Sequence, residues 1–424
     1  MLDIKYIREN TEIVKKGVKD KQLESTVDIE KLVKLDQKFL SLLKKVEAAR
    51  AARNQLSDDV AKFEGAARKS LIEKATKTKE ELLVMERDLR DLKEQIDAIA
   101  LWVPNPPADD VPYGKDASGN KVVKTVGKKR SFAFKPKDHL ELGARLGIID
   151  VERGVKIGGF RSYFLVNQGA ELSQAILRLA ADHMKKQGFD FYEVPWMVNR
   201  EYLIGTGYFP WGEEDHYKTQ DDQGLIGTAE VSLTSYYANE ILSEGDLPKK
   251  LAGISPCFRR EVGSHGVDTK GVYRVHQFMK VEQVVLVAEG EEISREWHEK
   301  MLGYSEDILK MLDLPYQVLL MCTGDMGAGQ RKKYDIETWF PAQEAYRETH
   351  SDSYFLDFQA RRLNIRYKKK SGELKFVSTL NNTVAATPRL MAAVLENYQR
   401  EDGSVEIPPV LRDYLGYAEI SPHS

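Results

Sequence analysis

The feature that most constrains the fold of this 424-residue chain is a pair of apolar seams within its first hundred residues. In each seam the positions recur at alternating steps of three and four residues, with Arg53 occupying one position of the first seam, and this is the period of a coiled coil. A connector at residues 64–68 contains Gly65 and separates the seams. Two matched seams joined by so short a connector predict an antiparallel helical hairpin in which each seam buries the other. The seam positions are Leu32, Leu35, Phe39, Leu42, Val46, Ala49, Leu56, Val60 and Phe63, then Leu71, Ala75, Thr78, Leu82, Met85, Leu89, Leu92, Ile96 and Ile99.

The turn of this hairpin is locally basic. At about 1.5 Å per residue, each helix of the arm reaches on the order of 50 Å from its base. A solvated coiled-coil face has the same mixture of residues, so the charge alone leaves open whether the tip binds anything. The basic residues are Lys62, Arg68, Lys69, Lys74, Lys77 and Lys79, against Glu64 and Glu73.

A proline-rich stretch at residues 102–112 follows the hairpin. Prolines block helix continuation and stiffen the connection, so a domain boundary is expected near residue 103. Beyond it, helical patterns alternate with β-rich segments, which predicts an α+β fold. The expected helices are 172–187, 229–243, 291–312 and 389–401, and the expected strands are 191–194, 250–258, 281–288 and 375–380.

Bulk properties exclude several classes of protein. The first residues mix both charge signs and lack the apolar core of a secretory signal. The longest apolar runs have strand length, not the roughly 20 residues that span a bilayer. Two cysteines, Cys257 and Cys322, fit a reducing compartment and leave neither a disulfide framework nor a zinc tetrad. We therefore expect a cytoplasmic protein. The net charge of −3 means that any RNA contact needs a local basic patch.

Neither of the two familiar glycine-rich phosphate loops occurs in the sequence. Gly266 and Gly271 have the right spacing, but Val272 follows where the pattern needs a lysine. A bound nucleotide would therefore be held by side chains.

Suitable side chains follow the β-rich segment at residues 250–258. Arg259 and Glu261 enter a loop that contains residues 263–266 and Gly271, and a second segment begins near Arg274. Two strands joined in this way would form a cradle, and the planar fork of an arginine can donate two parallel hydrogen bonds to a phosphate. An isolated Arg-x-Glu pattern more often pairs with its neighbours, so a wider match is needed.

That wider match is present, because residues 257–264 (CFRREVGS) and 274–282 (RVHQFMKVE) closely resemble the second signature motif of seryl-tRNA synthetases. The N-terminal hairpin also resembles the tRNA-binding arm of that family. The resemblance thus covers nearly the whole chain. It extends through residues 205–207 (GTG), 228–230 (TAE), 333–337 (KYDIE), 357–362 (DFQARR) and 395–399 (LENYQ).

The resemblance implies a tRNA-binding domain at residues 1–103, with a coiled-coil arm at about 28–100, and a class II synthetase catalytic domain at 104–424. The catalytic domain would have an antiparallel sheet flanked by helices. The implied activity is that of a serine–tRNA ligase, which activates serine with ATP to seryl-adenylate and transfers it to tRNA(Ser). Whether tRNA(Sec) is also charged stays open. A homodimer formed around residues 193–195 and Mg²⁺ bound with the ATP are implied as well.

The resemblance also assigns roles around the nucleotide. Arg259 would grip the α-phosphate, Glu261 would help to place the adenosine, and Phe278 would stack on the adenine. A flat aromatic ring matches a base, and cations are needed where charge builds on phosphorus. Oxygen ligands suit the hard Mg²⁺ ion, for which Glu348 and Ser351 are the implied metal-binding residues. The implied catalytic residues are Arg259, Glu261 and Arg389, and the implied ATP-binding residues are Arg259, Arg260, Glu261, Val275, Phe278, Glu348, Thr349, His350, Ser351 and Arg389.

For serine, Glu230 suits the ammonium group, and Glu282 with Thr383 suits the hydroxyl. A pocket built to hydrogen-bond a hydroxyl discriminates against alanine by about 10⁴-fold or more, because its own polar groups are otherwise left unpaired. A threonine at a strand end usually bonds only to backbone, which is the alternative for Thr383. The implied serine-binding residues are Thr228, Ala229, Glu230, Arg259, Glu282, Asn381 and Thr383, and the implied tRNA-binding residues are Arg68, Lys69, Lys74 and Lys77.

Two segments depart from the family pattern. Where many members carry Ser-Ser-Cys-Ser-Asn, residues 350–354 read HSDSY, and the third motif at 381–389 (NNTVAATPR) has less glycine than is common. Two other functions are alternatives to this interpretation. A ligase that charges a carrier protein would not need the hairpin, and a catalytically inactive dimeric scaffold would be expected to lack the phosphate and serine ligands found here.

Overall fold

The computed structural model describes residues 1–262 and 271–422. The chain divides into two compact units, Met1–Pro106 and Pro107–Ser424. The predicted loop residues 263–266 lie outside the described residues.

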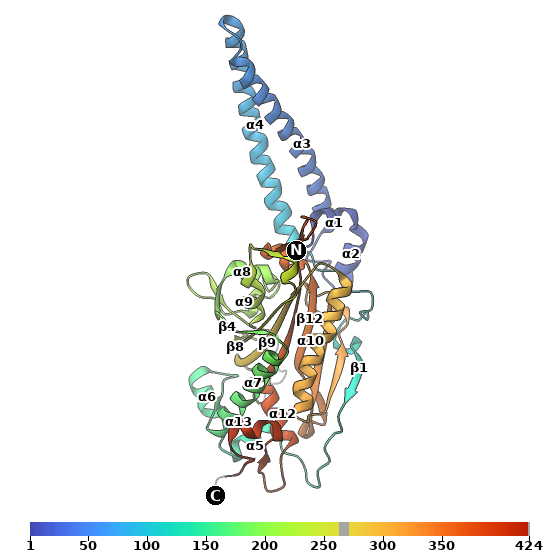
Figure 1. The fold of residues 1–424 in the computed structure, drawn as a ribbon, viewed down its shortest axis with the longest axis vertical. Coiled ribbons are helices and arrows are strands. Elements are labelled where there is room, and N and C mark those ends of the chain that lie inside the picture. The colour runs from blue at the N-terminus through green and yellow to red at the C-terminus, as the bar shows by residue number, and fades with distance from the viewer. Residues whose placement is uncertain (263–270, 423–424) are drawn as a thin grey trace. The chain divides into compact units, whose positions relative to one another are not determined.

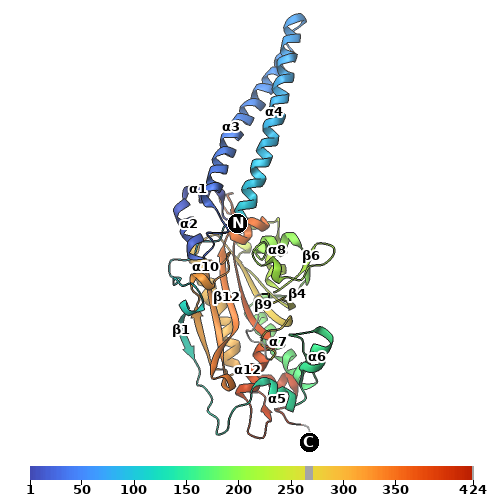
Figure 2. The same ribbon diagram turned by 180° about the vertical axis from the view of Figure 1, so that it is seen from behind.

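The first unit is helical, and its two long helices form the predicted antiparallel hairpin (Figures 1 and 2). The carboxylate of Asp28 caps the first long helix by accepting from the backbone N–H of Lys31 at 2.9 Å. Gly65 begins the second with a φ of +64°, a conformation that glycine adopts without strain. The helices of this unit are α1 (Ile4–Glu9), α2 (Thr11–Asp20), α3 (Ile29–Val60) and α4 (Gly65–Ala100).

Burial along the hairpin follows the predicted seams. Val46 and Leu82 are buried between α3 and α4, and the other seam positions are buried or half-buried, with one exception. Phe63 is 51% exposed, because α3 ends at Val60 and leaves this ring in the turn. Arg50 of α3 also joins the helices, since its Nη2 lies 2.7 Å from Oε1 of Glu86 on α4.

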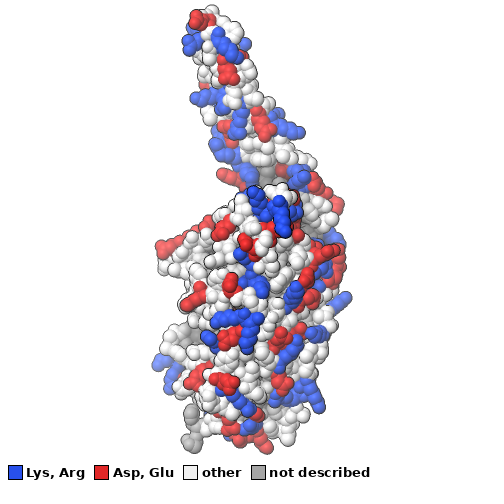
Figure 3. Space-filling model, in the orientation of Figure 1, with Lys and Arg blue, Asp and Glu red and all other residues white. Residues whose placement is uncertain are grey.

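The basic residues of the tip face solvent. Arg68, Lys69, Lys74 and Lys77 are all exposed, and none of them forms an ion pair with another described residue. Figure 3 shows basic and acidic side chains interspersed along the arm. Their cationic groups are therefore accessible to an anionic partner.

The second unit is built on an eight-stranded sheet in the order β1-β10-β11-β12-β15-β9-β8-β4. Neighbouring strands are antiparallel except β4 and β8, which are parallel. The strands are β1 (Lys121–Val126), β4 (Asp190–Glu193), β8 (Lys249–Phe258), β9 (Gln277–Val287), β10 (Tyr316–Leu320), β11 (Lys332–Phe340), β12 (Ala345–Leu356) and β15 (Ser378–Thr387).

Two helices, α7 (Gln168–Lys186) and α10 (Glu291–Met311), cover one face of this sheet (Figures 1 and 2). Strand residues alternate between the two faces. On β9, Val281 and Val285 are fully buried in the core, and Gln283 donates to the backbone carbonyl of Met301 on α10 at 3.0 Å. The intervening residues of β9 therefore project to the opposite face, where the candidate site lies.

Most of the predicted elements are present, but the helix predicted at residues 229–243 is wrong. Helix α9 (Glu230–Thr234) ends after one turn and a half, and Asn239 has a φ of 63°. Residues Ile241–Ser243 then form β7, which pairs in parallel with β13 (Arg366–Lys368). Tertiary pairing outweighs the local helical pattern here. The strand predicted at 375–380 is also divided, between β14 (Leu374–Phe376) and β15.

Shorter elements complete the unit. No helix within residues 1–262 and 271–422 is long and apolar enough to cross a membrane. The remaining helices and strands are α5 (His139–Arg145), α6 (Val151–Gly158), α8 (Arg200–Thr206), α11 (Phe358–Leu363), α12 (Arg389–Asn397), α13 (Pro409–Leu415), β2 (Ile149–Asp150), β3 (Phe164–Leu165), β5 (Met197–Asn199), β6 (Gln223–Leu225), β16 (Val405–Glu406) and β17 (Glu419–Ile420).

The arm offers a matched test of its packing. Leu82 and Leu83 are adjacent on α4, but Leu82 is 3% exposed and Leu83 is 58% exposed. We expect Leu82→Ala to lower the free energy of unfolding of the hairpin by about 2–5 kcal/mol, because it leaves a cavity in the seam. Leu83→Ala should change it by less than about 0.5 kcal/mol. Hydrogen exchange of the α3 and α4 amides measures both, and equal protection in the two variants would contradict the seam.

Candidate functional site

A cleft opens on the face of the sheet opposite α10. Strand β9 contributes Phe278, Lys280 and Glu282, which follow one another at every second residue. The neighbouring strands β15 and β12 contribute Asn381 with Thr383, and residues 348–351, respectively. The cleft is therefore formed by residues far apart in the sequence that the antiparallel sheet brings side by side.

At one end of the cleft, Arg389 is fixed against Glu348. Arg389 begins α12, and its Nη1 lies 3.2 Å from Oε2 of Glu348 and donates to that residue's backbone carbonyl at 3.1 Å. Its Nε donates to the carbonyl of Tyr273 at 3.0 Å, and its guanidinium lies 4.3 Å from the centre of the Tyr273 ring. Burial opposes ionisation of Glu348, but the charges of Arg389 and Lys333 outweigh it and lower the pKa of this carboxyl to about 2.

Arg259 follows β8 directly and lies in the same cleft. Its backbone is held by His276, whose Nδ1–H donates to the Arg259 carbonyl at 2.9 Å and whose own carbonyl accepts from the Arg259 N–H at 3.0 Å. The Arg259 guanidinium lies 5.2 Å from the centre of the Phe278 ring. A cation and an aromatic ring are thus presented together, and His276 has a structural role because it holds the Arg259 backbone.

The two residues after Arg259 point in different directions. Glu261, with a φ of 54°, lines the cleft and forms an ion pair of 2.6 Å with Arg274. It does not share a strand face with Arg259, because β8 ends at Phe258. Arg260 is exposed and outside the cleft lining, since its Nη1 donates to the carbonyl of Glu214 at 2.8 Å. The structure therefore does not bring Arg260 to the predicted nucleotide site.

At the other end of the cleft, Glu230 is buried and bonded through both carboxylate oxygens. Tyr208 donates its hydroxyl to Oε2 at 2.7 Å, and Gln359 donates its amide to Oε1 at 2.8 Å. Burial raises the pKa of Glu230 to about 7 despite these donors. Thr228 and Ala229 are fully buried beside it and outside the lining; the Thr228 hydroxyl accepts from the Glu230 N–H at 3.2 Å.

A second buried carboxylate, Glu282, lies next to Glu230 in the lining. It forms an ion pair with Lys280, two residues before it on the same face of β9. Thr383 stands opposite Glu282 in the register of β15 and β9, and Asn381 is one position further along that face. The structure therefore brings together Glu230, Glu282, Thr383 and Asn381, four of the predicted serine-binding residues.

The predicted residues of β12 line the cleft, and two of them, Thr349 and His350, are bonded to each other. Thr349 and Thr338 share a hydrogen bond of 2.8 Å, and His350 Nδ1 lies 2.8 Å from the Thr349 hydroxyl. Burial lowers the pKa of His350 to about 4, so its ring is neutral at physiological pH. Ser351 and Val275 complete the predicted set in the lining.

Comparison with known proteins gives this geometry its context. The model for the seryl-tRNA synthetase N-terminal domain matches residues 1–107, and that for the class II tRNA synthetase core domain (G, H, P, S and T) matches residues 214–398. The serine–tRNA ligase of Deinococcus radiodurans is 42% identical over 421 residues, which are 99% of each chain. The chain belongs to the seryl-tRNA synthetase family. The serine–tRNA ligase of Rubrobacter xylanophilus is 41% identical to this chain, and the match covers 100% of this chain and 99% of that ligase.

Solved structures of the family have the same fold over the full length. The Pyrococcus horikoshii seryl-tRNA synthetase complexed with ATP aligns with a TM-score of 0.94 and 40% identity, covering 100% of both chains. The cytoplasmic serine–tRNA ligase of Naegleria fowleri in complex with AMP aligns with a TM-score of 0.90 and 29% identity, covering 100% of this chain and 99% of its own. The predicted family, the α+β fold class with its helical arm, and the aminoacyl-tRNA synthetase activity are thereby confirmed.

The seryl-tRNA synthetase cleft also contains residues that the sequence analysis did not single out. Tyr208 follows the quoted GTG motif directly, and Lys280 lies two residues before Glu282, so strand periodicity could have found it. Tyr273 and Gln330 carry no comparable signal, because their place in the lining depends on the tertiary fold. The full set of additional lining residues is Tyr208, Tyr273, Arg274, Lys280, Gln330, Ala386, Thr387 and Pro388.

Proposed function

We propose that this cleft is where the chain activates serine with ATP, before the seryl group passes to the 3′ end of tRNA(Ser). One observation carries the proposal: Arg259 and Arg389 share a single cleft with the buried carboxylates Glu230 and Glu282. The arginines suit a polyphosphate, and the carboxylates suit an ammonium and a hydroxyl. Neither a carrier-protein ligase nor an inactive scaffold is favoured, since the relatives matched over the full length are serine–tRNA ligases.

For the nucleotide, Arg259 holds the α-phosphate and Arg389 the terminal phosphate, while Glu261 and Phe278 hold the adenosine. The position of the Arg259 guanidinium beside the Phe278 ring supports this division, because a base stacked on the ring has its phosphates near the cation. The ATP in the Pyrococcus horikoshii relative supports ATP as the nucleotide. Val275, Thr349 and His350 form the adjoining wall, and Arg260 takes no part in it because it is directed outward.

A magnesium ion that accompanies ATP would be held by Glu348 and Ser351. Within the described residues no group of three or more His, Cys, Asp or Glu can hold a metal ion alone. Two protein oxygens suit Mg²⁺, which keeps its other positions for phosphate oxygens and water. The lowered pKa of Glu348 keeps this ligand ionised at neutral pH. When bound, the ion neutralises phosphate charge.

The reaction needs no nucleophile from the protein. The serine carboxylate attacks the α-phosphorus in line, forming the acyl phosphate bond as the bond to the β-phosphate oxygen breaks and pyrophosphate leaves. A terminal ribose hydroxyl of the tRNA then attacks the seryl carbonyl and displaces AMP. The protein contributes positioning and stabilisation of charge on the phosphorus, which is the work of Arg259.

For serine, Glu230 binds the ammonium group, and Glu282 and Thr383 form hydrogen bonds with the hydroxyl. Asn381, Thr228 and Ala229 complete the pocket. Lys280 keeps Glu282 paired in a buried site, where an unpaired carboxylate would be costly. Alanine lacks the hydroxyl and would leave these polar groups unsatisfied, which is the basis of selection for serine.

The arm, within a tRNA-binding domain at residues 1–103, is proposed to bind tRNA(Ser) through Arg68, Lys69, Lys74 and Lys77. Their exposure and their lack of ion pairs with other described residues support this role. The catalytic domain is proposed to span residues 104–424. Charging of tRNA(Sec) by the same contacts is a further proposal, as is a cytoplasmic location, which the cytoplasmic Naegleria fowleri relative supports.

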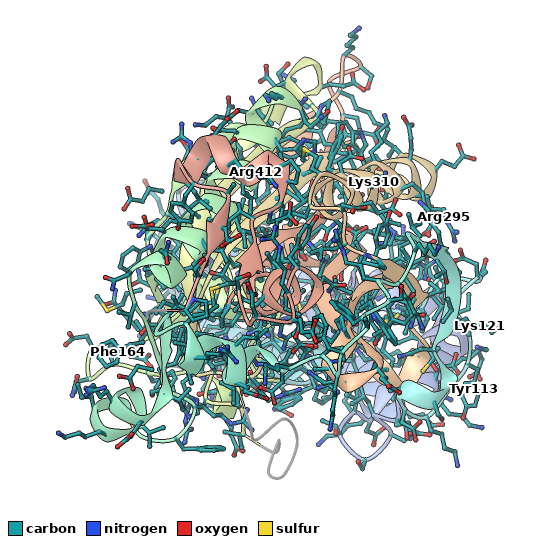
Figure 4. The ribbon with its side chains drawn as sticks, turned by 90° about the horizontal axis from the view of Figure 1, so that it is seen from below. Tyr113, Lys121, Phe164, Arg295, Lys310 and Arg412 are labelled. Carbon is teal, nitrogen blue, oxygen red and sulfur yellow. The ribbon has the colours of Figure 1, made fainter. Side chains whose placement is uncertain are left out.

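The chain is also proposed to act as a homodimer through the segment around residues 193–195. This segment ends β4, an edge strand of the large sheet, and Trp196 and Met197 beside it are about half exposed. Phe164 of β3 is similarly exposed and lies at the periphery of the molecule (Figure 4). Exposed apolar side chains next to a strand edge are typical of an interface between subunits.

Adjacent arginines give a matched test of the ATP site. We expect Arg259→Ala to reduce serine-dependent ATP/pyrophosphate exchange by about 100-fold or more, because phosphate charge is no longer stabilised. Arg260→Ala should retain exchange within about threefold, since Arg260 lies outside the cleft. Initial exchange rates at saturating Mg²⁺ measure both. Near-normal exchange by Arg259→Ala would contradict the proposed site.

The raised pKa of Glu230 predicts a pH dependence of serine binding. Only the ionised carboxylate attracts an ammonium group, so the serine KM should rise as pH falls below about 7, where Glu230 becomes protonated. The pH profile of kcat/KM for serine should therefore fall on the acid side of about pH 7. In Glu230→Gln this fall should be absent. A fall in kcat/KM near pH 4.5, which is the pKa of an ordinary glutamate, would contradict the effect of burial on Glu230.

The tip of the arm is tested by neutralising its cations. Replacing Arg68, Lys69, Lys74 and Lys77 with alanine should raise the tRNA KM in aminoacylation by about tenfold or more, because contacts with phosphate are lost. Exchange of pyrophosphate in the same variant should be unchanged, which provides the internal control. An equal loss of both activities would contradict a role confined to tRNA.

A further inference from the structure

A row of hydrogen-bonded side chains lies behind Glu230, away from the cleft. The hydroxyl of Thr379 on β15 donates to Oε1 of Gln359 at 2.6 Å. Gln359, on α11, donates its Nε2 to Oε1 of Glu230 at 2.8 Å and to the backbone carbonyl of Thr206 at 2.9 Å. Segments distant in the sequence therefore meet at one side-chain amide.

The hydrogen bonds of this row can run in only one donor-to-acceptor direction. A carboxylate and a backbone carbonyl only accept hydrogen bonds, so the NH₂ of Gln359 must face Glu230 and Thr206. The amide oxygen then faces Thr379, whose hydroxyl supplies the matching donor. Turning the amide around would set its oxygen against two acceptors, so Thr379 and Thr206 together hold Gln359 in one orientation.

Burial prevents Gln359 from acting directly on a ligand. Gln359 and Thr379 are both fully buried, and neither is part of the cleft lining. Glu230 does line the cleft, and its second oxygen accepts from Tyr208 at 2.7 Å. With a fixed donor on each oxygen, the plane of the Glu230 carboxylate is set from two sides.

We propose that Gln359 is a positioning residue for amino-acid recognition, which holds the Glu230 carboxylate in the orientation that receives the substrate ammonium group. Thr379 is the residue that orients Gln359. The inference rests on the proposed function only in assigning the ammonium group to Glu230. A buried carboxylate free to rotate would lose order and hydrogen bonds, and its affinity for a cation would fall.

Other charged groups also act on Glu230 and must be kept constant. Tyr208 bonds to it, the charges of Glu282 and Lys280 act on it, and Arg259 lines the same cleft. The ring of His216 packs edge-on against Tyr208 with 5.3 Å between ring centres, and burial lowers the pKa of this histidine. Substitutions of Gln359 and Thr379 leave all of these groups in place.

The test compares variants that remove the donor while preserving volume. Gln359→Met removes the amide, Gln359→Glu replaces the donor with an acceptor that repels Glu230, and Thr379→Val removes the hydroxyl that orients the amide. Thr379→Ser keeps that hydroxyl and serves as the matched control. Far-UV circular dichroism and thermal midpoints identify any variant that fails to fold. If a Gln359 variant does not fold, Thr379→Val is used for the test in its place.

Two readouts are used. In steady-state exchange, Gln359→Met should raise the serine KM by about tenfold or more, with kcat and the ATP KM within about threefold, because an interaction of the bound substrate is weakened. Thr379→Val should raise the serine KM less, and Thr379→Ser should leave the serine KM unchanged. In the ligand-free protein, infrared titration of the protonated carboxyl band that disappears in Glu230→Gln should have its midpoint shifted upward by about one pH unit in Gln359→Met.

The outcomes separate this proposal from the proposed function. An unchanged serine KM and an unchanged carboxyl titration, with only a lower thermal midpoint, would overturn the positioning role, because a purely structural residue behaves in that way. An upward shift of the titration in a protein without any serine-dependent exchange would refute the proposed function while supporting the contact from Gln359 to Glu230.

Discussion

The two-residue period of β9 is the constraint on which the second unit depends. Val281, Gln283 and Val285 face the helices on one side, while Lys280 and Glu282 face the cleft on the other. A slip of one residue in its pairing with β8 or β15 would exchange these two sets, placing charges in the core and valines in the cleft. The register that stabilises the fold is therefore the same register that assembles the site, and neither can change independently.

Within the cleft, charge is buried in compensated form. Removing one partner of a buried ion pair typically costs about 3–5 kcal/mol, because the other charge is left without compensation. Lys280 with Glu282 keeps such a cost low in the ligand-free protein, whereas the pair of Arg389 and Glu348 is only partly buried. Glu230 has no cationic partner at hydrogen-bond distance among the described residues, and this is the carboxyl whose pKa is raised to about 7. The three carboxylates thus differ in their partners, and Glu348 also differs in depth, since its side chain is 42% exposed whereas Glu230 and Glu282 are buried.

Much of this architecture could be predicted from the sequence, because the signals are local and periodic. The seams of α3 and α4 follow a helical repeat, and only Phe63 fails, at the position where the helix has ended. The site residues in motifs were predictable by resemblance. Gln359 lies inside a quoted motif, yet its role depends on Thr379 and Glu230, which reach it from other elements. The false helix at 229–243 fails for the same reason, since β7 forms only by pairing with a distant strand.

Because the arm is an antiparallel hairpin, its length alone sets the distance between its tip and its base. Both ends of the hairpin, at Ile29 and Ala100, lie at its base, and the seams continue without interruption between them and the turn. Removing or adding seven residues in each helix preserves the seam and changes the reach by about 10 Å. The reach of the tip can therefore vary in whole heptads without any change at the base, whereas an unpaired insertion in one helix would break the match between the seams.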